Sequence, residues 1–301
     1  MSKIVSVFGA TGSQGGAVVE ALLKDGKFKV RALTRNVDSP KAQALKAKGA
    51  EVVKADLDDS VDQLAKALEG SYGVFLVTDF WTVFQKELEQ GKKAADAALK
   101  AHVKHLVFST LSHCIKLSHG KLSVPHFDLK AEIEQHIRDL SAKNPEFVSS
   151  FVLAPFYAQN LSTYFVPRKG EDGSYSLSLP LDPSQGPMEI ADINDIGPIV
   201  SGIFNDPKKF SGVAVPFQGS VVTGEQIAEI ISKTSGKKVS FNFVPPKVFA
   251  TFFPGAEEMA TMFQFYSEFG SFPGKDVKIA QSLATQSTLE QFLTKNPIKL
   301  E

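Results

Sequence analysis

The stretch VSVFGATGSQGGAVVEALL, residues 5–23, joins an apolar run to an amphipathic run through a glycine-rich turn. The apolar run is predicted to be a short β-strand. Residues 15–24 are predicted to be a helix, because their apolar side chains recur at helical spacing. Gly9, Gly12 and Gly15 stand three residues apart in a GxxGxxG pattern. A strand, a glycine turn and a helix in this order are typical of a βαβ unit that binds a dinucleotide.

Each glycine has a physical role in such a turn. Gly9 allows the sharp turn at the end of the strand, Gly12 lets the backbone approach a pyrophosphate, and Gly15 lets helix and strand pack closely. The N-terminal N–H groups and the positive dipole end of the helix then face the phosphates. We therefore expect a bound dinucleotide; the alternative is a glycine-rich turn that binds nothing.

Strands and helices continue to alternate up to residue 155. Apolar or β-branched runs, each predicted to be a strand, occupy residues 3–9, 29–35, 51–57, 73–78, 105–110 and 147–155. Segments predicted to be helices lie between them, at residues 15–24, 40–48, 61–68 and 85–102 and after Pro125. This alternation predicts right-handed βαβ units in a parallel sheet, the Rossmann-type doubly wound α/β fold.

The pattern changes after residue 155, where prolines and glycines become frequent. Residues 175–181 alternate like an exposed strand, and helices are predicted at residues 193–204 and 223–234. We predict an NAD(P)-binding Rossmann domain at residues 1–155. The remainder, residues 156–301, is predicted to be a smaller α/β C-terminal lobe packed over the carboxyl edge of the sheet, where ligands bind in such folds.

Composition argues against several classes of protein. Thirty-three basic residues balance thirty-three acidic residues, so the total charge gives no sign of nucleic-acid or membrane binding. Cys114 is the only cysteine, which excludes an internal disulfide and fits a reducing compartment. There is no signal-peptide pattern, and no apolar run approaches the ~18 residues of a membrane span. We expect a cytoplasmic protein without direct nucleic-acid or membrane contact, with entry into the nucleus left open.

The end of the second predicted strand bears on the choice of dinucleotide. About twenty residues after the glycine turn an acidic side chain would bind a ribose 2′-hydroxyl. Here Thr34 and Arg35 occupy that place. A guanidinium pairs with a 2′-phosphate and stacks on adenine. NADP(H) is therefore favoured over NAD(H), although Asp38 brings an unfavourable charge; the alternative is an ordinary surface arginine.

Several motifs together resemble the NmrA-like family, atypical members of the short-chain dehydrogenase/reductase superfamily. They are FGATGSQGG (8–16), LTRN (33–36), Asp56-Leu57, VTDFW (77–81), HFDLK (126–130), PFYAQN (155–160), DINDIGPIV (192–200), TGEQIAEIISKTSGKKV (223–239) and FPGAEEMATMFQFY (253–266). The resemblance covers essentially the whole chain. It implies a Rossmann fold, bound NADP(H) and a role as a redox sensor in transcription regulation.

The resemblance also implies cofactor-binding positions, residue by residue. Arg35 and Asn36 would face the 2′-phosphate, whereas Asp56 and Leu57 would flank the adenine. The other positions belong to the turn, the exit of the fourth strand and the nicotinamide end, and are Gly9, Ala10, Thr11, Gly12, Ser13, Gln14 and Gly15, then Thr78, Asp79 and Phe80, then Lys130, Tyr157, Ala158, Gln159 and Asn160. Residues 37–39 depart from the family's sensor, which carries further basic residues there.

Residues 126–130 carry the question of catalysis. Short-chain dehydrogenases use a Tyr-x-x-x-Lys pair on one helix, in which the lysine lowers the tyrosine pKa for proton transfer. Here Lys130 is present, but His126 stands in the position of the tyrosine. We expect Lys130 to bind the ribose or nicotinamide end without hydride transfer. Two alternatives stay open: His126 acts as a general acid, or both residues lie on a solvated helix face.

Two other clusters invite a functional interpretation. All six histidines lie between His102 and His136, but without a His-x3-His pair or an HExxH motif, so no metal site is expected. A thiolate pair of His113 with Cys114 is an alternative. The aromatic run at residues 249–272 is predicted to pack in the core of the lobe; the alternative is a lid or a partner surface.

We therefore predict an NADP(H)-binding regulatory protein. It would act as a redox sensor that responds to NADPH and NADP⁺ by a change in conformation or association. The complete glycine turn and the missing tyrosine support this prediction. A protein partner, a homodimer or both are expected in addition to the dinucleotide. The alternative is an NADPH-dependent reductase of a quinone, enone or aromatic ether that uses Lys130.

Overall fold

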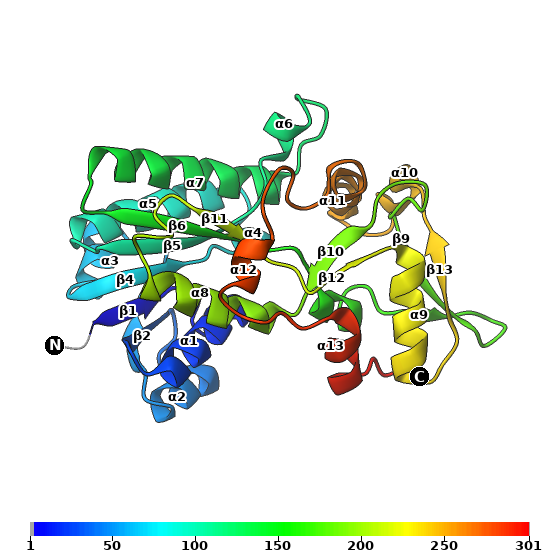
Figure 1. The fold of residues 1–301 in the computed structure, drawn as a ribbon, viewed down its shortest axis with the longest axis horizontal. Coiled ribbons are helices and arrows are strands. Elements are labelled where there is room, and N and C mark those ends of the chain that lie inside the picture. Colours follow the sequence, from blue (N-terminus) through cyan, green and yellow to red (C-terminus); the bar gives the residue numbers. More distant parts are fainter. Residues whose placement is uncertain (1–2, 301) are drawn as a thin grey trace.

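The computed structural model describes residues 3–300, and its largest element is a seven-stranded sheet (Figure 1). The strand order is β11-β6-β5-β4-β1-β2-β3, and every neighbouring pair is parallel. The strands are β1 (Ile4–Val7), β2 (Lys29–Thr34), β3 (Glu51–Lys54), β4 (Ser71–Leu76), β5 (His105–Thr110), β6 (Val148–Leu153) and β11 (Ala214–Pro216). The order reverses between β1 and β4, which confirms the predicted Rossmann-type doubly wound sheet.

Helices cover both faces of this sheet (Figure 1). One face carries α1 (Ser13–Asp25), α2 (Pro40–Ala47) and α8 (Ile196–Asn205), and the other carries α3 (Val61–Ala67), α5 (Lys86–Lys100) and α7 (Pro125–Lys143). The short helices α4 (Phe80–Val83) and α6 (Cys114–Leu117) lie in loops. Val18 and Phe204 are fully or almost fully buried on the first face, as Leu64 and Ile133 are on the second. Both faces are therefore covered, as the apolar strands predict.

Local sequence explains where these helices begin. The Ser60 hydroxyl accepts a hydrogen bond from the backbone N–H of Gln63, whose side chain accepts one from Ser60 N, and this capping box starts α3. Ser39 Oγ accepts a hydrogen bond from Ala42 N at the start of α2. Helix α1 differs, because its N-cap is Gly12, which has no side chain to offer. Its first N–H groups are left for another partner.

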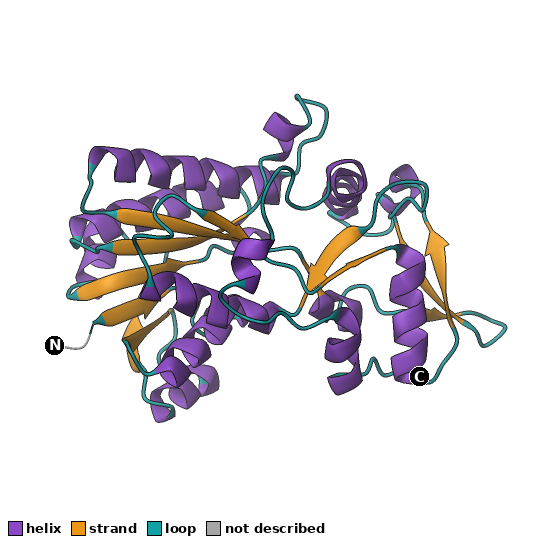
Figure 2. Cartoon of the chain, viewed as in Figure 1, coloured by secondary structure: helices purple, strands orange, loops and turns teal. Residues whose placement is uncertain are grey.

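Most of the chain after residue 155 forms a smaller lobe beyond the carboxyl ends of the large sheet (Figure 2). Its two three-stranded sheets consist of β7 (Phe156–Tyr157), β10 (Met188–Ala191) and β12 (Ser220–Val222), and of β8 (Arg168–Lys169), β9 (Tyr175–Leu179) and β13 (Val239–Phe243). The helical elements are η1 (Ala158–Ser162), η2 (Ile193–Asp195), α9 (Gly224–Ser235), α10 (Pro246–Phe249), α11 (Ala256–Phe269), α12 (Lys278–Gln281) and α13 (Leu289–Lys295).

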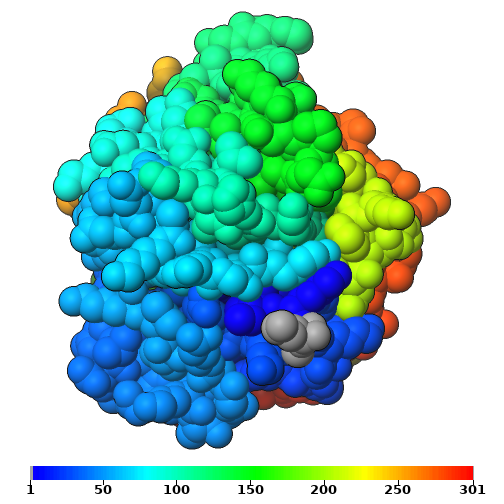
Figure 3. Space-filling model, turned by 90° about the vertical axis from the view of Figure 1, so that its left-hand side faces the viewer, coloured from blue at the N-terminus to red at the C-terminus, as the bar shows by residue number. Residues whose placement is uncertain are grey.

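The chain returns to the large sheet after residue 155, first with α8 and β11 and again with α12, whose Ala280 is buried in the same core cluster as α8. Helix α8 packs on α1, and β11 pairs with β6 at the edge of the sheet. Seen from the amino ends of the strands, this yellow-green segment lies beside the green end of the first half (Figure 3). The division of the chain at residue 155 stays a prediction, and this return passage crosses it.

Two expectations for the lobe agree with the burial of its side chains. Strand β9 does alternate: Tyr175, Leu177 and Leu179 are buried because α9 packs against that face. The two serines between them, on the other face, are partly exposed, which confirms the alternation. In the aromatic run, Phe263 and Tyr266 of α11 are buried in the same cluster, which confirms core packing for these side chains. Within residues 3–300, no helix is both long and apolar enough to span a membrane.

Candidate functional site

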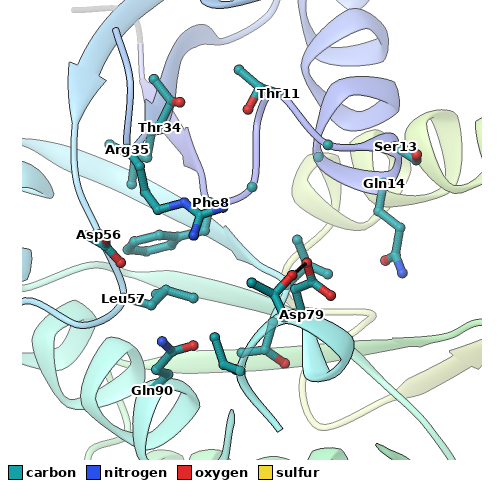
Figure 4. A pocket seen from close by; sticks show the side chains of 18 of the residues that line it. Phe8, Thr11, Ser13, Gln14, Thr34, Arg35, Asp56, Leu57, Asp79 and Gln90 are labelled. Carbon is teal, nitrogen blue, oxygen red and sulfur yellow. Dashed lines mark hydrogen bonds between the residues drawn. The ribbon is translucent and has the colours of Figure 1, made fainter. Parts of the chain in front are cut away.

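A cavity of about 630 Å³ lies at the carboxyl ends of β1 to β4, where a doubly wound sheet binds its ligand (Figure 4). Four strand ends, helix α1, the α4 segment, α5 and η2 all contribute to its wall. The lining residues are Phe8, Gly9, Thr11, Gly12, Ser13, Gln14, Gly15, Leu33, Thr34, Arg35, Ala55, Asp56, Leu57, Val77, Thr78, Asp79, Trp81, Thr82, Val83, Gln90 and Ile193.

The glycine turn forms one wall of this cavity, and its backbone requires glycine. Gly9 has a φ of 63°, in the left-handed region. A Cβ atom at position 15 would lie 2.2 Å from the carbonyl oxygen of Gly9, and one at position 12 would lie 3.2 Å from the same atom. Strand and helix therefore approach as closely as the sequence predicts.

The start of α1 supplies donors at this wall. Gly16 N donates to Gly12 O at 2.9 Å in the first turn of the helix. The N–H groups of Ser13, Gln14 and Gly15 precede that bond, so the helix itself offers them no acceptor. All three residues line the cavity. A pyrophosphate fits this end, because it would accept from these N–H groups at the positive end of the helix dipole.

A second pocket of about 540 Å³ adjoins the cavity at Arg35. Its lining residues are Thr11, Thr34, Arg35, Asn36, Ser39, Pro40 and Lys41. Two of these side chains, Arg35 and Lys41, are cations, and both are exposed. Asp38, whose charge counted against a 2′-phosphate, is not one of the lining residues. The chemistry of this pocket fits a phosphate on the ribose.

The opposite wall carries Asp56 and Leu57, together with apolar side chains from the strand ends (Figure 4). Gln90 of α5 is held there, because its side-chain amide donates to Asp58 Oδ1 at 2.8 Å. This hydrogen bond is the main reason why the pKa of Asp58 lies below its usual value. A flat base fits between such apolar and polar groups.

Sequence reasoning missed part of the wall. The missed residues are Phe8, Leu33, Ala55, Val77, Trp81, Thr82, Val83, Gln90 and Ile193. Phe8, Leu33, Ala55 and Val77 lie within the last three residues of the predicted strands, so the carboxyl-end rule alone points to them. Gln90 and Ile193 had no such signal, since they reach the cavity from a helix and from the lobe.

Several expected positions lie outside the cavity wall. Ala10 and Phe80 are almost completely buried. Gln159 positions a lining residue. Its side chain donates to Asp192 Oδ1 at 2.6 Å and accepts from Ile193 N at 3.2 Å, and Ile193 lines the cavity. For these residues, and for Ala158 and Asn160 in η1, direct contact with a cofactor stays a prediction.

Tyr157 is the last of the expected positions at the nicotinamide end. Its hydroxyl is buried and has no hydrogen-bond partner within the described chain. Burial raises the pKa of Tyr157, so the hydroxyl stays protonated at neutral pH. The group is therefore a donor that still lacks an acceptor.

Lys130 lies just behind the wall and has three acceptors. Its ammonium donates to Thr78 O at 2.9 Å, to Thr78 Oγ1 at 2.8 Å and to Glu87 Oε1 at 2.5 Å. The residue is 8% exposed and Glu87 is fully buried. The three protons of the ammonium are thus all used within the protein.

His126, one helical turn earlier, is similarly engaged. Its backbone N–H and its Nδ1 both contact Glu258 Oε1, at 2.7 Å and 2.6 Å. The ring lies 5.1 Å from that of Trp81 and 5.8 Å from that of Phe80, centroid to centroid. His126 and Lys130 are both buried, so the alternative of a solvated helix face was wrong. Helices α5 and α11 cover this part of α7.

Cys114 and its neighbours do not form a reactive thiol. The side chain is fully buried, and burial raises the pKa of the thiol. His113 Nδ1 contacts Asp128 Oδ1 at 3.0 Å, so the alternative of a His113–Cys114 pair was wrong. Between residues 3 and 300, no group of three or more His, Cys, Asp or Glu side chains is arranged to hold a metal ion.

The model of the NmrA-like family matches residues 1–300. The chain belongs to the NmrA-like family. An NmrA-like family domain-containing protein of Dictyostelium discoideum is 45% identical over 305 residues, covering 100% of both chains. An NmrA-like family domain-containing oxidoreductase of Aspergillus hancockii is 33% identical over 279 residues, covering 87% of this chain and 82% of its own.

Solved structures of the NmrA-like fold superpose on the whole chain. NmrA, a negative transcriptional regulator, matches with a TM-score of 0.83 in complex with NAD and 0.82 in complex with NADP, at 22% identity, over 98% of this chain and 95% of that one. The NADPH-dependent quinone oxidoreductase QOR2 of Escherichia coli, complexed with NADPH, matches with a TM-score of 0.78 at 24% identity, over 97% and 99%. These matches show the NAD(P)-binding fold.

Proposed function

We propose that this NmrA-like protein binds NADP(H) and acts as a regulatory redox sensor. One observation carries the proposal: the side chains of His126 and Lys130, which stand in the positions of the Tyr-x-x-x-Lys pair of short-chain dehydrogenases, are already hydrogen-bonded to other groups of the protein. Lys130 is held by Thr78 and Glu87, and His126 is held by Glu258. Neither side chain lines the cavity, which supports binding of a dinucleotide without proton transfer to a substrate.

The pocket beside Arg35 supports a preference for NADP(H). Arg35 and Lys41 bring two positive charges to the place where a 2′-phosphate would lie, and the pocket walls contain no carboxylate. NmrA itself has been solved with NAD and with NADP, so the fold alone does not decide between them. The preference therefore rests on the side chains of this chain.

Each part of the cavity has a proposed role. The turn from Gly9 to Gly15 would bind the pyrophosphate, Arg35 and Asn36 the 2′-phosphate, and Asp56 with Leu57 the adenine side. Bound NADPH supplies a hydride donor. The residues of this chain would bind it and orient it.

Calorimetric titration with NADPH, NADP⁺, NADH and NAD⁺ tests the proposal. We expect Arg35→Ala to weaken NADPH binding by roughly tenfold to a hundredfold, because a charge-assisted contact is lost, and to weaken NADH binding much less. Lys46→Ala, on the far part of α2, is the matched control. Unchanged NADPH affinity in Arg35→Ala would refute the 2′-phosphate assignment.

A reductase is the second candidate. Two observations favour it: the relatives named oxidoreductases, and the buried Tyr157 hydroxyl, which has no partner within the described residues. NADPH oxidation across a panel of quinones, enones and aromatic ethers decides between the two. Steady turnover that Lys130→Ala abolishes would contradict a protein that only senses the cofactor.

The proposed output is a change in conformation or association, with a protein partner or a second copy of the chain, in the cytoplasm. Sedimentation of the protein with NADPH, with NADP⁺ and without cofactor tests the association. A change in mass with only one redox state of the cofactor supports a sensor, since a switch requires different binding energies for two states.

A further inference from the structure

Residues 78–87 form a segment whose two ends are joined by one side chain. The segment leaves β4 at Thr78, contains α4 and enters α5 at Glu87. The ammonium of Lys130 donates to Thr78 O, Thr78 Oγ1 and Glu87 Oε1. Because these groups are buried, water does not compete for the bonds. Lys130 therefore joins the two ends of this segment, Thr78 and Glu87, by hydrogen bonds.

The same segment forms part of the cavity wall. Asp79, Trp81, Thr82 and Val83 all line the cavity. Phe84, which follows α4, has a φ of 49° and a ψ of −124°. A side chain in this region of the backbone map is strained and persists only where its surroundings hold it. A ligand in the cavity would touch this held, strained segment directly.

The tip of the segment contacts the smaller lobe. The Trp81 ring lies 5.1 Å from the ring of His126, whose backbone N–H and Nδ1 both contact Glu258 Oε1 at the start of α11. A Cβ atom at Gly255, the N-cap of α11, would lie 4.0 Å from the Trp81 ring. The wall of the cavity is thus connected to α11 through the Trp81 and His126 rings and Glu258, and the Trp81 ring also lies near the N-cap of α11.

We propose that residues 78–87 couple occupancy of the dinucleotide cavity to helix α11. Lys130 holds the base of the segment, and the contact from Trp81 through His126 to Glu258 transmits a change at its tip. The inference rests on the proposed sensor function and states how the bound cofactor reaches the smaller lobe. It assigns Glu258 as a positioning residue that acts through His126.

The geometry favours α11 as the responding element. His126 is 7% exposed and Glu258 is half-buried, so their interaction is weakly screened by salt. One carboxylate oxygen contacts two groups of the same residue, which fixes the relative position of α7 and α11. A shift of Trp81 toward the lobe would press on this contact, because the rings of Trp81 and His126 lie 5.1 Å apart.

Hydrogen exchange on the full-length protein, with and without saturating NADPH, tests the coupling. In the wild type we expect NADPH to slow amide exchange in residues 78–87 and to change the amide exchange rate in α11 by about fivefold or more. Glu258→Ala keeps the response of residues 78–87 but reduces that of α11 to less than about twofold. Glu258→Gln, which retains an acceptor for the His126 N–H, restores part of it. Glu257→Ala, the exposed neighbour in the same turn, behaves as the wild type.

The outcomes separate this inference from the proposed function. Calorimetry on the same samples reports whether NADPH binds. Binding in the wild type without an α11 response overturns the coupling and leaves the cofactor assignment intact. An α11 response of equal size in Glu258→Ala also overturns it. No NADPH binding in the wild type refutes the proposed function and, with it, the coupling.

Discussion

The glycine turn and the α4 segment (residues 78–87) both contribute to the wall of one cavity, but they are built in opposite ways. The turn is made of backbone: Gly9, Gly12 and Gly15 bring it close, and the first N–H groups of α1 have no acceptor in their own helix. The α4 segment is held by side chains that are already paired, at Lys130 and at His126. The first wall offers groups to a ligand, whereas the second is fixed by the protein itself.

This difference separates the part of the cavity where a ligand gains binding energy from the part where a ligand would move the protein. Donors that lack an acceptor gain a hydrogen bond when a phosphate arrives, at no cost to existing contacts. A wall whose anchoring side chains are already paired and buried gains little by contact, but movement of it disturbs bonds that reach other elements. We therefore expect binding to depend on the first wall and the response to depend on the second.

The largest expected effect comes from Gly15→Ala. The new Cβ would meet the Gly9 carbonyl oxygen at 2.2 Å, so strand and helix must separate. We expect a loss of more than about 4 kcal/mol in the free energy of unfolding and no measurable NADPH binding. Gly16→Ala is the control, since its Cβ would lie 3.4 Å from Ala10 O. Urea unfolding of both variants measures the difference; equal stability would contradict the close approach of strand and helix at this turn.

Lys130→Met tests the other wall. The substitution leaves the Glu87 carboxylate fully buried without its cation, and we expect a loss of about 4 kcal/mol in unfolding free energy. The double variant Lys130→Met, Glu87→Leu removes both charges and recovers most of that loss. Urea unfolding of the single and double variants forms the cycle. Additive losses would contradict a coupled pair.

Asp195 tests whether a hydrogen bond within the protein offsets the cost of burying a carboxylate. Its Oδ2 accepts from Ser287 N at 2.8 Å, yet burial raises the pKa of Asp195 to about 6. The folded protein therefore holds this proton between about pH 4 and 6, and the stability contributed by the group falls as pH rises through that window. The full effect is up to about 3 kcal/mol above pH 6.

Asp195→Asn has no such titration, so its stability relative to the wild type should rise from pH 4 to pH 6 and then stay level. Urea unfolding at several pH values measures this difference. A difference that is the same at every pH would show that the carboxyl group titrates as it does in the unfolded chain.

The smallest effect is expected from Lys41→Ala in the pocket beside Arg35. The side chain is exposed, so its interaction with a 2′-phosphate is screened, and NADPH affinity should fall only about threefold. Calorimetry at low and high salt measures it, and the difference from the wild type should shrink at high salt. An effect larger than that of Arg35→Ala would show that Lys41, and not Arg35, is the main contact of the 2′-phosphate.

The fold and the first wall could be predicted from the sequence because their determinants are local. Glycine spacing, strand periodicity and the residue after each strand lie within a few positions of one another. The second wall could not be predicted in this way. Lys130 contacts Glu87, which is 43 residues away in the sequence, and His126 contacts Glu258, which is 132 residues away. Such pairs depend on how α5, α7 and α11 pack, and a motif that names Lys130 says nothing about its partner.

Trp81 gives the molecule an optical property of its own. It is the only tryptophan in the chain, it is 43% exposed, and it lines the cavity. Indole emission overlaps the absorption band of the reduced nicotinamide ring, which the oxidised ring lacks. The native protein therefore carries an unlabelled fluorophore in the wall of the cavity in which we expect the dinucleotide to bind.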